Sequence, residues 1–293
     1  MSAQTIKYSA ELMQNYLQAE IMQPEAGFQA IQTKSGNALL LSLGTDNSLY
    51  VTAESPGLRT GWARSNLSAA QAAASFGGQS GAVCKDFTVA QQPGGSIHLA
   101  MVLAVAEQND RLFLSLGNSD ADTSWIDSPN WREYPYDDPD HPRSKVQIAD
   151  VFISEASDGE YIVVDVIRDP GSAEPLIFRY YIDTSRENGY AWRAHDVAVD
   201  IEAGRYRSCL GRKGRQGSYA VDGIYTSGQV NGRAQLIYAP LFNVFDPSLP
   251  PNPDRLRLPD DGLVPDALAA CRQAADNTSA LYVACLLYTS RCV

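Results

Sequence analysis

Five basic side chains gather in one short stretch of an otherwise acidic chain. The stretch RYRSCLGRKGRQG contains Arg205, Arg207, Arg212, Lys213 and Arg215. Guanidinium groups bind carboxylates, sulfates and phosphates through paired, charge-assisted hydrogen bonds. We therefore take Arg205, Arg212 and Arg215 as candidates for binding an anion. The alternative is a solvated loop between two structural repeats, in which these charges have no ligand.

A second candidate for ligand contact is the segment WREYPYDDPDHPRS, from Trp131 to Ser144. Aromatic rings beside carboxylates contact sugar faces and hydroxyls, and they are also common in protein interfaces. The alternative is an ordered loop without a ligand, which its prolines favour. The acids of this segment lack the glycine and closing glutamate of a calcium loop, so we predict no metal site. The candidate residues are Trp131, Tyr134, Tyr136 and Asp137.

Tryptophans recur at matched positions. The stretches LYVTAESPGLRTGW and LFLSLGNSDADTSW each place a tryptophan 13 residues after a leading leucine, and a third tryptophan closes a longer loop. One interpretation is structural, because a large ring that packs between neighbouring sheets is stabilised by burial. The other is an aromatic platform at the mouth of a ligand pocket. The residues concerned are Trp62, Trp125 and Trp192.

The sequence contains none of the common catalytic motifs. His98, His141 and His195 share no motif, and Gly-x-Ser-x-Gly, HExxH and CxxC are absent. The glycines of GRKGRQG recur every third residue, which is not the spacing of a dinucleotide-binding loop. We therefore predict no cofactor and assign no catalytic residue. His98 stands in an apolar stretch and is expected to be a core residue.

A glycoside hydrolase would need carboxylates that converge in space, two of them about 5–9.5 Å apart. Asp46 and Asp150 are candidates that the sequence does not place. The sialidase repeat motif Ser-x-Asp-x-Gly-x-Thr-Trp is matched by NSDADTSW at Asp120 and Trp125, but Asp122 stands where the turn needs glycine. We interpret this match as chance.

Composition excludes several classes of protein. The 293 residues are 44% hydrophobic and 19% charged, with a net charge of −11. This balance is typical of a soluble globular protein, and it argues against sequence-independent binding to nucleic acid or to an anionic membrane surface. No apolar run reaches the ~20 residues of a membrane span, and the amino terminus lacks the pattern of a Sec signal peptide. The five cysteines have no metal-type spacing, so we expect reduced, mostly buried thiols.

The elements that must position these residues repeat along the chain. Phe28 and Phe87 each precede a glycine by eight residues, Gly36 and Gly95, and a fourth copy has Gly223 in that place. Asn-Asp and Asn-Gly turns, which supply positive φ, predict hairpins in LAVAEQNDRLFLSL and IYTSGQVNGRAQLIYA. No long helical pattern follows residue 27. The leucines that lead each copy are Leu49, Leu112, Leu176, Leu236 and Leu281.

A repeat of about 60 residues with short antiparallel strands predicts an all-β fold, a β-propeller that is incomplete at its carboxyl end. Stacked blades bury the sheet faces that one blade leaves exposed. The alternative is a pair of β-sandwiches, which does not need equal periods. The expected division is a segment with helical spacing at 1–26, repeats at 27–283 (27–85, 86–145, 146–204, 205–262 and a partial 263–283), and a truncated or non-native tail at 284–293.

The tandem pattern of an apolar triplet, a loop and a tryptophan resembles the lectin-type β-propellers of the tectonin and tachylectin kind over residues 28–283. The resemblance implies sugar or glycan binding at sites repeated between blades, with Trp62, Trp125 and Trp192 as the repeat positions. We therefore expect a non-catalytic module that binds a carbohydrate or a protein partner. The alternative is a β-propeller glycoside hydrolase or lyase that uses central carboxylates.

Overall fold

The computed structural model describes most of the chain between residues 28 and 284. The segment 1–26, expected to be helical, and residues 285–293 of the predicted tail lie outside the described residues. The chain forms two compact units, residues 1–137 with 151–160 and residues 138–150 with 161–293. The described ranges are 28–44, 48–55, 58–59, 62–65, 67, 69–92, 94–138, 140, 145–153, 162–171, 176–182, 184, 192–194, 199–202, 206–216, 219–230, 233–240, 254–256, 267–272 and 279–284.

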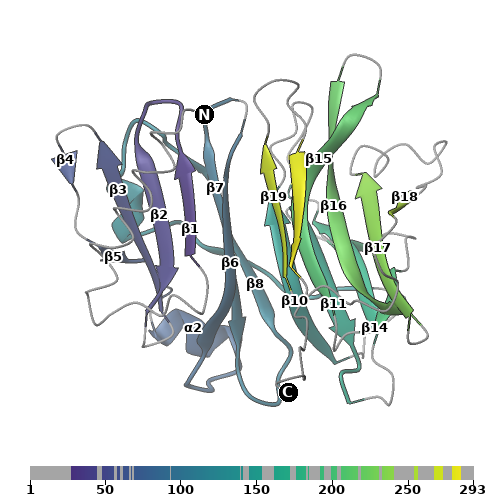
Figure 1. The fold of residues 1–293 in the computed structure, drawn as a ribbon. Coiled ribbons are helices and arrows are strands. Elements are labelled where there is room, and N and C mark those ends of the chain that lie inside the picture. The colour runs from purple at the N-terminus through teal and green to yellow at the C-terminus, as the bar shows by residue number, and fades with distance from the viewer. Residues whose placement is uncertain are drawn as a thin grey trace, which may run out of the picture. The chain divides into compact units, whose positions relative to one another are not determined.

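The described residues of the first unit form two antiparallel sheets, the short α-helix α2 (Ala69–Ser75) (Figure 1) and the 3-10 helix η2 (Ser124–Asp127). The strand β7 (Ile97–Ala104), an inner strand of one of these sheets, reads IHLAMVLA. Seven of its eight residues are buried, so both of its faces are covered. The first sheet consists of β1 (Phe28–Gln32), β2 (Ala38–Leu43), β3 (Leu49–Ser55) and β4 (Leu58–Arg59), with β5 (Ala63–Arg64) also paired to β3. The second consists of β6 (Val83–Gln91), β7 (Ile97–Ala104), β8 (Arg111–Asn118) and β9 (Arg132–Tyr134).

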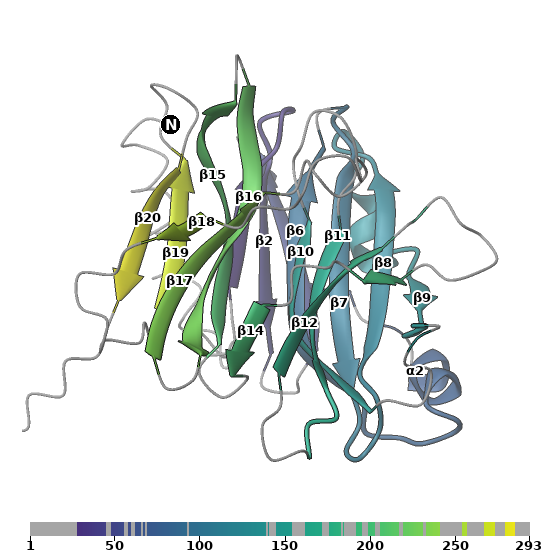
Figure 2. The ribbon, with the colours of Figure 1, turned by 90° about the vertical axis from the view of Figure 1, so that its right-hand side faces the viewer.

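The described residues that remain form three further antiparallel sheets, which belong to the second unit except for residues 151–153 of β10. One sheet consists of β10 (Val146–Ile153), β11 (Ile162–Arg168), β12 (Leu176–Ile182), β13 (Trp192–Ala194) and β14 (Val199–Glu202). Another consists of β15 (Arg207–Gln216), β16 (Tyr219–Val230), β17 (Arg233–Pro240) and β18 (Asp254–Leu256). The third is the pair β19 (Ala267–Arg272) and β20 (Ser279–Ala284). Figure 2 shows this yellow pair beside the green strands β15–β17. Within each sheet the long strands pair with their neighbours in sequence, whereas the short strands β5 and β14 pair with β3 and β12.

Two of the predicted repeat positions form the same turn. Gly36 and Gly95 both have positive φ, at 89° and 98°. In the first turn the amide of Thr33 donates to the carbonyl of Asn37, and in the second the amide of Gln92 donates to the carbonyl of Ser96, each at 2.8 Å. Glycine tolerates this backbone conformation without a steric penalty. The equal spacing in sequence therefore reflects an equal hairpin geometry.

Other details of the repeat differ from the expectation. Gly223 does not occupy a turn but lies within β16, where a Cβ atom would meet the Tyr238 ring at 2.5 Å. In the β7–β8 hairpin the positive φ falls at Glu107 and not at the Asn-Asp pair. The β16–β17 hairpin forms as predicted, with Val230 opposite Arg233. The first four leading leucines lie in the third strand of their sheets, whereas Leu281 lies in β20, the second of the two strands described there.

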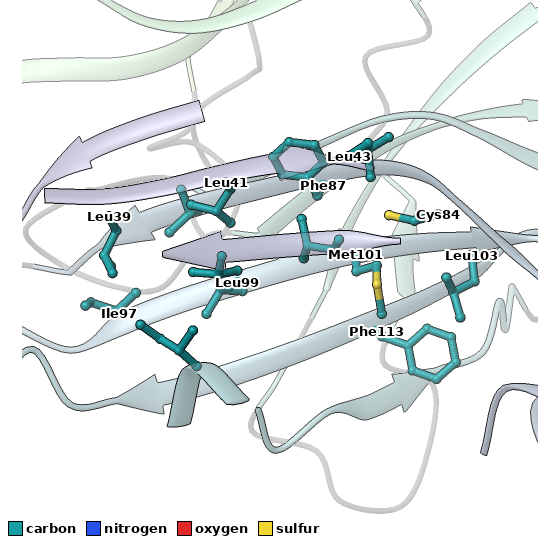
Figure 3. Packing of buried hydrophobic residues seen from close by; sticks show 14 of the residues in the cluster. Leu39, Leu41, Leu43, Cys84, Phe87, Ile97, Leu99, Met101, Leu103 and Phe113 are labelled. Atoms are coloured by element: carbon teal, nitrogen blue, oxygen red, sulfur yellow. The ribbon is translucent and has the colours of Figure 1, made fainter. Parts of the chain in front are cut away.

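A hydrophobic core fills the first unit between its sheets. Figure 3 shows side chains from β2, β6, β7 and β8 packed together, among them Leu41, Phe87 and Leu99. The Gln29 side chain ties the two sheets at their first strands, because its amide donates to the Phe87 carbonyl at 2.8 Å and its oxygen accepts from the Val89 amide at 3.1 Å. The leucine-rich runs of the repeats therefore bury their apolar area within this unit.

The Asp120 carboxylate fastens the loop after β8 to the two glycine turns. It accepts hydrogen bonds from the Ser35 amide at 2.9 Å, the Ser35 hydroxyl at 2.6 Å and the Gln91 side-chain amide at 2.9 Å. Partial burial raises the pKa of Asp120, but these hydrogen bonds outweigh burial and hold its pKa below the ordinary value. Asp120 is thus a structural residue that joins three loops.

We predict that Asp120→Asn lowers the free energy of unfolding at pH 7 by about 1 kcal/mol, because it weakens hydrogen bonds to a charged acceptor whose contacts with Ser35 are screened by solvent. The folded-state pKa is lowered, so the carboxylate stabilises the fold above its unfolded pKa of about 4 and loses that effect as the pH falls through the folded value. The free energies of unfolding of the wild type and Asp120→Asn, measured by denaturant titration, should therefore converge as the pH falls from 7 to 3. The exposed Asp127→Asn serves as control, and an Asp120→Asn deficit that persists unchanged in acid would contradict the prediction.

Candidate functional site

The second unit contains an ion pair with no solvent exposure. Asp165 on β11 and Arg179 on β12 stand directly opposite each other in the antiparallel register. The guanidinium donates from Nε to Oδ1 and from Nη2 to Oδ2, each at 2.7 Å, and both side chains have a relative exposure of 0%. Burying two charges costs several kcal/mol per ion, and only close, well-aligned pairing offsets that cost. The register of this hairpin is what supplies the alignment.

Two groups from the neighbouring sheet of the same unit bind this pair. Thr226 on β16 accepts a hydrogen bond from Arg179 Nη2 at 3.0 Å. The Tyr206 hydroxyl, immediately before β15, donates a short hydrogen bond to Asp165 Oδ2. Both residues are buried. The ion pair therefore links β11 and β12 to β15 and β16.

A chain of hydroxyl groups runs from Asp165 toward a less buried carboxyl. The Tyr206 hydroxyl lies 2.6 Å from Ser208 Oγ, and Ser208 Oγ lies 2.6 Å from Asp150 Oδ2. Ser208 is on β15 and Asp150 is on β10, the first strand of its sheet. Asp150 and Ser208 are both partly exposed. Two hydroxyl groups thus connect a fully buried carboxylate with one that solvent reaches.

Burial and charge shift the titration of the groups in this network. Burial lowers the pKa of Arg179, but the charge and hydrogen bonding of Asp165, together with Tyr206 and Tyr181, outweigh burial and raise the pKa above its ordinary value. Burial raises the pKa of Tyr206 well above its usual range, and the charges of Asp165 and Asp150 add to the increase. Burial, together with the charge of Asp150, raises the pKa of Cys209 to about 12. Arg179 therefore stays charged and both Tyr206 and Cys209 stay protonated at neutral pH.

Of these residues, the sequence analysis proposes only Asp150, as a candidate carboxylate for glycoside hydrolysis. Asp165 and Arg179 carry a recognisable signal, because each is a charge in the middle of an apolar strand, in IVVDVIR and LIFRYYI. Such charges are rarely fully buried unless they are paired. Tyr206, Ser208 and Thr226 have no comparable signal. Asp46, the other carboxylate considered, lies outside the described residues.

Three of the predicted aromatic positions lie in the first unit and are half-buried. Trp62 lies between β4 and β5, Trp125 lies in the 3-10 helix η2 (Ser124–Asp127), and Trp131 precedes β9. The indole N–H of Trp125 donates to the Ser119 carbonyl at 2.9 Å, and that of Trp131 donates to the Ser65 carbonyl at 2.8 Å. Both rings pack against the core of this unit. Hydrogen bonding and packing thus fix their orientation.

The aromatic residues after Trp131 differ in burial. Tyr134 is buried in β9, with the Arg132 guanidinium 5.3 Å from its ring centre. Burial raises the pKa of Tyr134 and the Arg132 charge opposes that increase. Tyr136 and Asp137 are half-buried beyond the end of the strand. Tyr134 therefore belongs to the packed sheet, whereas Tyr136 and Asp137 remain partly accessible.

Trp192 lies in the second unit and is almost fully buried. It begins β13 and meets the Tyr180 ring edge to face, with 5.7 Å between ring centres. The Tyr180 hydroxyl donates to Asp138 Oδ2 at 2.8 Å. The three recurring tryptophans thus occupy three different kinds of element, and they do not share one position in the sheets.

The basic stretch is not a loop between repeats, as one interpretation held. Arg212 and Arg215 lie within β15, opposite Asp222 and Ala220, where the register shifts between them. Their side chains, and Arg205 as a whole, lie outside what the structure describes. The glycines of this stretch therefore belong to a paired strand with an irregularity.

Three further observations on the described residues bear on function. His98 is a buried core residue on β7, and its Nδ1 accepts a hydrogen bond from the Gly117 amide at 2.9 Å. In the part of the chain that the structure describes, no three or more His, Cys, Asp or Glu side chains gather in a way that would hold a metal ion. Nor does any helix described there combine the length and apolar character that a membrane crossing requires.

Comparison with known proteins identifies the fold. No protein-family model matches the chain, and no curated protein matches it in sequence. The structure is similar to the crystal structure of an α-L-arabinofuranosidase from Lactobacillus brevis, with a TM-score of 0.50 and 12% identity, over 95% of this chain and 88% of that chain. That protein is a five-bladed β-propeller. The chain has a β-propeller fold. The predicted fold class is confirmed, whereas membership of the tectonin-type lectins is not supported.

We predict that Arg179→Met destabilises the protein by about 3–5 kcal/mol, because it leaves the Asp165 charge buried without its partner. The double variant Asp165→Leu with Arg179→Met should recover most of that loss, since no charge then remains in the apolar site. Denaturant unfolding of the two single variants and the double variant measures this coupling. Additive losses in the double variant would show that the two side chains do not act as a pair.

We predict that the thiols of Cys84 and Cys209 do not react with an alkylating reagent at pH 8 in the folded protein. Burial is the main cause that raises the pKa of both thiols, and the thiolate is the reactive form. Mass spectrometry of peptides after brief iodoacetamide treatment, with and without denaturant, distinguishes the folded from the unfolded reactivity. Rapid labelling of either residue without denaturant would contradict the described packing.

Proposed function

We propose that the protein is a glycoside hydrolase and that Asp150 is one of its catalytic carboxyl groups. The observation that carries the proposal is the position of Asp150. It is the partly exposed end of a hydrogen-bonded network whose other end is a fully buried ion pair. In a propeller, the strands of each blade succeed one another outward from a central channel, so a residue on a first strand such as β10 is suited to meet a ligand there.

The chemistry of glycoside hydrolysis suits this arrangement. Such enzymes use a pair of carboxyl groups, one of which protonates the leaving oxygen while the other activates water or attacks the sugar carbon. Asp150 meets two requirements of a catalytic carboxyl, because solvent reaches it and Ser208 fixes its orientation. Asp165 does not, since it is fully buried and both of its oxygens are bound by Arg179 and Tyr206. We therefore treat Asp165 as a positioning residue.

The likeness to an α-L-arabinofuranosidase supports a carbohydrate as the substrate class. It does so through the fold, because propellers of that shape offer a central site to which several blades contribute side chains. Arabinofuranosides are therefore the first substrates to test, followed by other pentosides and hexosides.

A second candidate function is carbohydrate binding without hydrolysis, in keeping with the lectin-like pattern of the sequence. The half-buried rings of Trp125 and Trp131 favour it, because their indole N–H groups are fixed by backbone carbonyls and part of each ring remains accessible. Rings held in one orientation lose little entropy when a sugar stacks on them. These two residues are in the first unit, whereas Asp150 is in the second, so substitutions separate the two functions.

The test is hydrolysis of a panel of 4-nitrophenyl glycosides, beginning with the α-L-arabinofuranoside. We expect turnover by the wild-type protein and a loss of about 10²–10⁴-fold in kcat for Asp150→Asn, which is the usual contribution of a proton-transferring group. Asp127→Asn, an exposed carboxylate in the first unit, is the matched control and should keep full activity.

Two results would overturn the proposal. One is the absence of turnover across the panel by folded protein, and the other is equal turnover by the wild type and Asp150→Asn. Glycan binding that survives in Asp150→Asn but is lost in Trp125→Ala, without turnover in any variant, would instead establish the second candidate function.

A further inference from the structure

One nitrogen of the buried Arg179 guanidinium has no acceptor within the protein. Nε and Nη2 both donate to Asp165, and Nη2 also donates to Thr226. Nη1 is buried as well, and it has no hydrogen-bond partner in the part of the chain that the structure describes. A buried N–H group of a charged side chain is costly when unpaired, so such groups are almost always bound by protein or by an ordered ligand. Nη1 therefore marks a binding site.

The geometry of the ion pair fixes the direction in which Nη1 points. A guanidinium is planar, and its five N–H groups have fixed directions. The bonds from Nε and Nη2 to the two oxygens of Asp165 use the parallel N–H groups along one side of the plane. The second hydrogen of Nη2, which remains for Thr226, lies at the outer end and runs parallel to one hydrogen of Nη1. Nη1 is thus directed to a point beside the Thr226 hydroxyl.

Thr226 on β16 supplies a second donor to that point. Its Oγ1 accepts from Arg179 Nη2 at 3.0 Å, so its own hydrogen is not used in that bond and can be donated to another acceptor. Parallel N–H groups of one guanidinium place their acceptors side by side, so an acceptor of Nη1 lies within hydrogen-bond reach of Thr226 Oγ1. Both residues are almost fully buried, each with a relative exposure of 1%. The site therefore consists of two buried donors that converge.

The nearest side chains of the same faces are mainly apolar. Ile177 and Tyr181 lie two residues before and two residues after Arg179 on β12, so all three share one face of the strand. Ile237 on β17 stands directly opposite Thr226. The two isoleucines belong to one buried cluster. They border the site, and they offer no acceptor to Nη1.

Charge determines which kind of acceptor fits. Asp165 and Arg179 neutralise each other, so an anion such as chloride would add one uncompensated negative charge at a place without solvent contact. Burying such a charge is costly, and the chain already has a net charge of −11. A cation or an apolar molecule cannot accept a hydrogen bond. Water is neutral, accepts two hydrogen bonds and is commonly buried where two or more polar groups converge.

We infer that one water molecule is bound in the second unit between Arg179 Nη1 and the Thr226 hydroxyl, as a resident ligand of the buried ion pair. It satisfies the nitrogen that Asp165 does not reach and adds a second link between β12 and β16. Such a water forms part of the structure and is costly to remove. The inference goes beyond the proposed function, because the site needs neither Asp150 nor a substrate.

The direct test is a crystal structure of the whole chain at a resolution that shows ordered water, with sodium bromide in place of chloride. We expect one oxygen peak about 2.7–3.2 Å from Arg179 Nη1 and about 2.5–3.0 Å from Thr226 Oγ1, without the anomalous signal of bromide. A bromide ion in this position would overturn the inference. So would a protein acceptor on Nη1, or the absence of any peak there.

Two variants test whether the guanidinium holds the water. The double variant Asp165→Leu with Arg179→Met lacks Nη1 and should lose the water, because one polar partner does not retain it. Ile177→Val is the matched control, since it removes one methylene group beside the site, leaves both donors in place and should keep the water. A water that persists in the double variant, or that is lost in the control, would contradict the inference.

The outcomes are independent of the proposed function. The wild-type crystal structure decides the inference by itself if the double variant does not fold. A protein that binds this water and hydrolyses no glycoside would support the inference while the proposed function fails. A protein that hydrolyses glycosides but has a bromide ion or a protein acceptor at Nη1 would show the reverse.

Discussion

The buried pair of Asp165 and Arg179 is the constraint on which the second unit depends. Two charges without solvent contact are stable only when each is hydrogen-bonded in several directions, and here the partners come from different strands. The pair therefore fixes the register of β11 against β12 and holds Tyr206 and Thr226 beside them. Asp150, at the accessible end of the hydroxyl chain, takes its orientation from the same source. Stability and the proposed chemistry share one network.

The first unit is organised on a different principle. Its sheets are held by a continuous hydrophobic core, and Asp120 joins the turns around Gly36 and Gly95 to the loop after β8. The tryptophans of the loops extend this core toward the surface. Trp125 and Trp131 therefore lie in a different unit from the buried pair, whereas Trp192 belongs to the same unit as that pair. A glycan-binding role and a hydrolytic role would depend on separate parts of the chain.

Much of the fold could be predicted from the sequence because short-range signals determine it. The spacing from Phe28 to Gly36 and from Phe87 to Gly95 marks the same hairpin, and the apolar runs that follow are strands. Detail within hairpins was harder, because tertiary packing overrides turn propensity. The left-handed residue of the β7–β8 turn is Glu107 and not the Asn-Asp pair, and Gly223 serves side-chain packing under Tyr238 rather than a turn.

The candidate site could be predicted only in fragments. Asp165 and Arg179 are conspicuous charges in apolar strands, but their pairing depends on a register that one sequence does not determine. Tyr206 and Ser208 are ordinary residues until the neighbouring sheet brings them beside that pair. The basic stretch drew attention by composition, yet Arg212 and Arg215 belong to a paired strand. Composition draws attention to clusters of charged residues along the chain. The hydrogen-bonded network around Asp165 depends instead on contacts between residues that are distant in sequence.

The central claim is that the buried pair of Asp165 and Arg179 organises the contacts that reach Asp150, and a crystal structure of the double variant Asp165→Leu with Arg179→Met tests it most directly. The account predicts that Tyr206 leaves its position in that variant and that Ser208 no longer contacts Asp150. An unchanged arrangement of Tyr206, Ser208 and Asp150 in the folded double variant would contradict it.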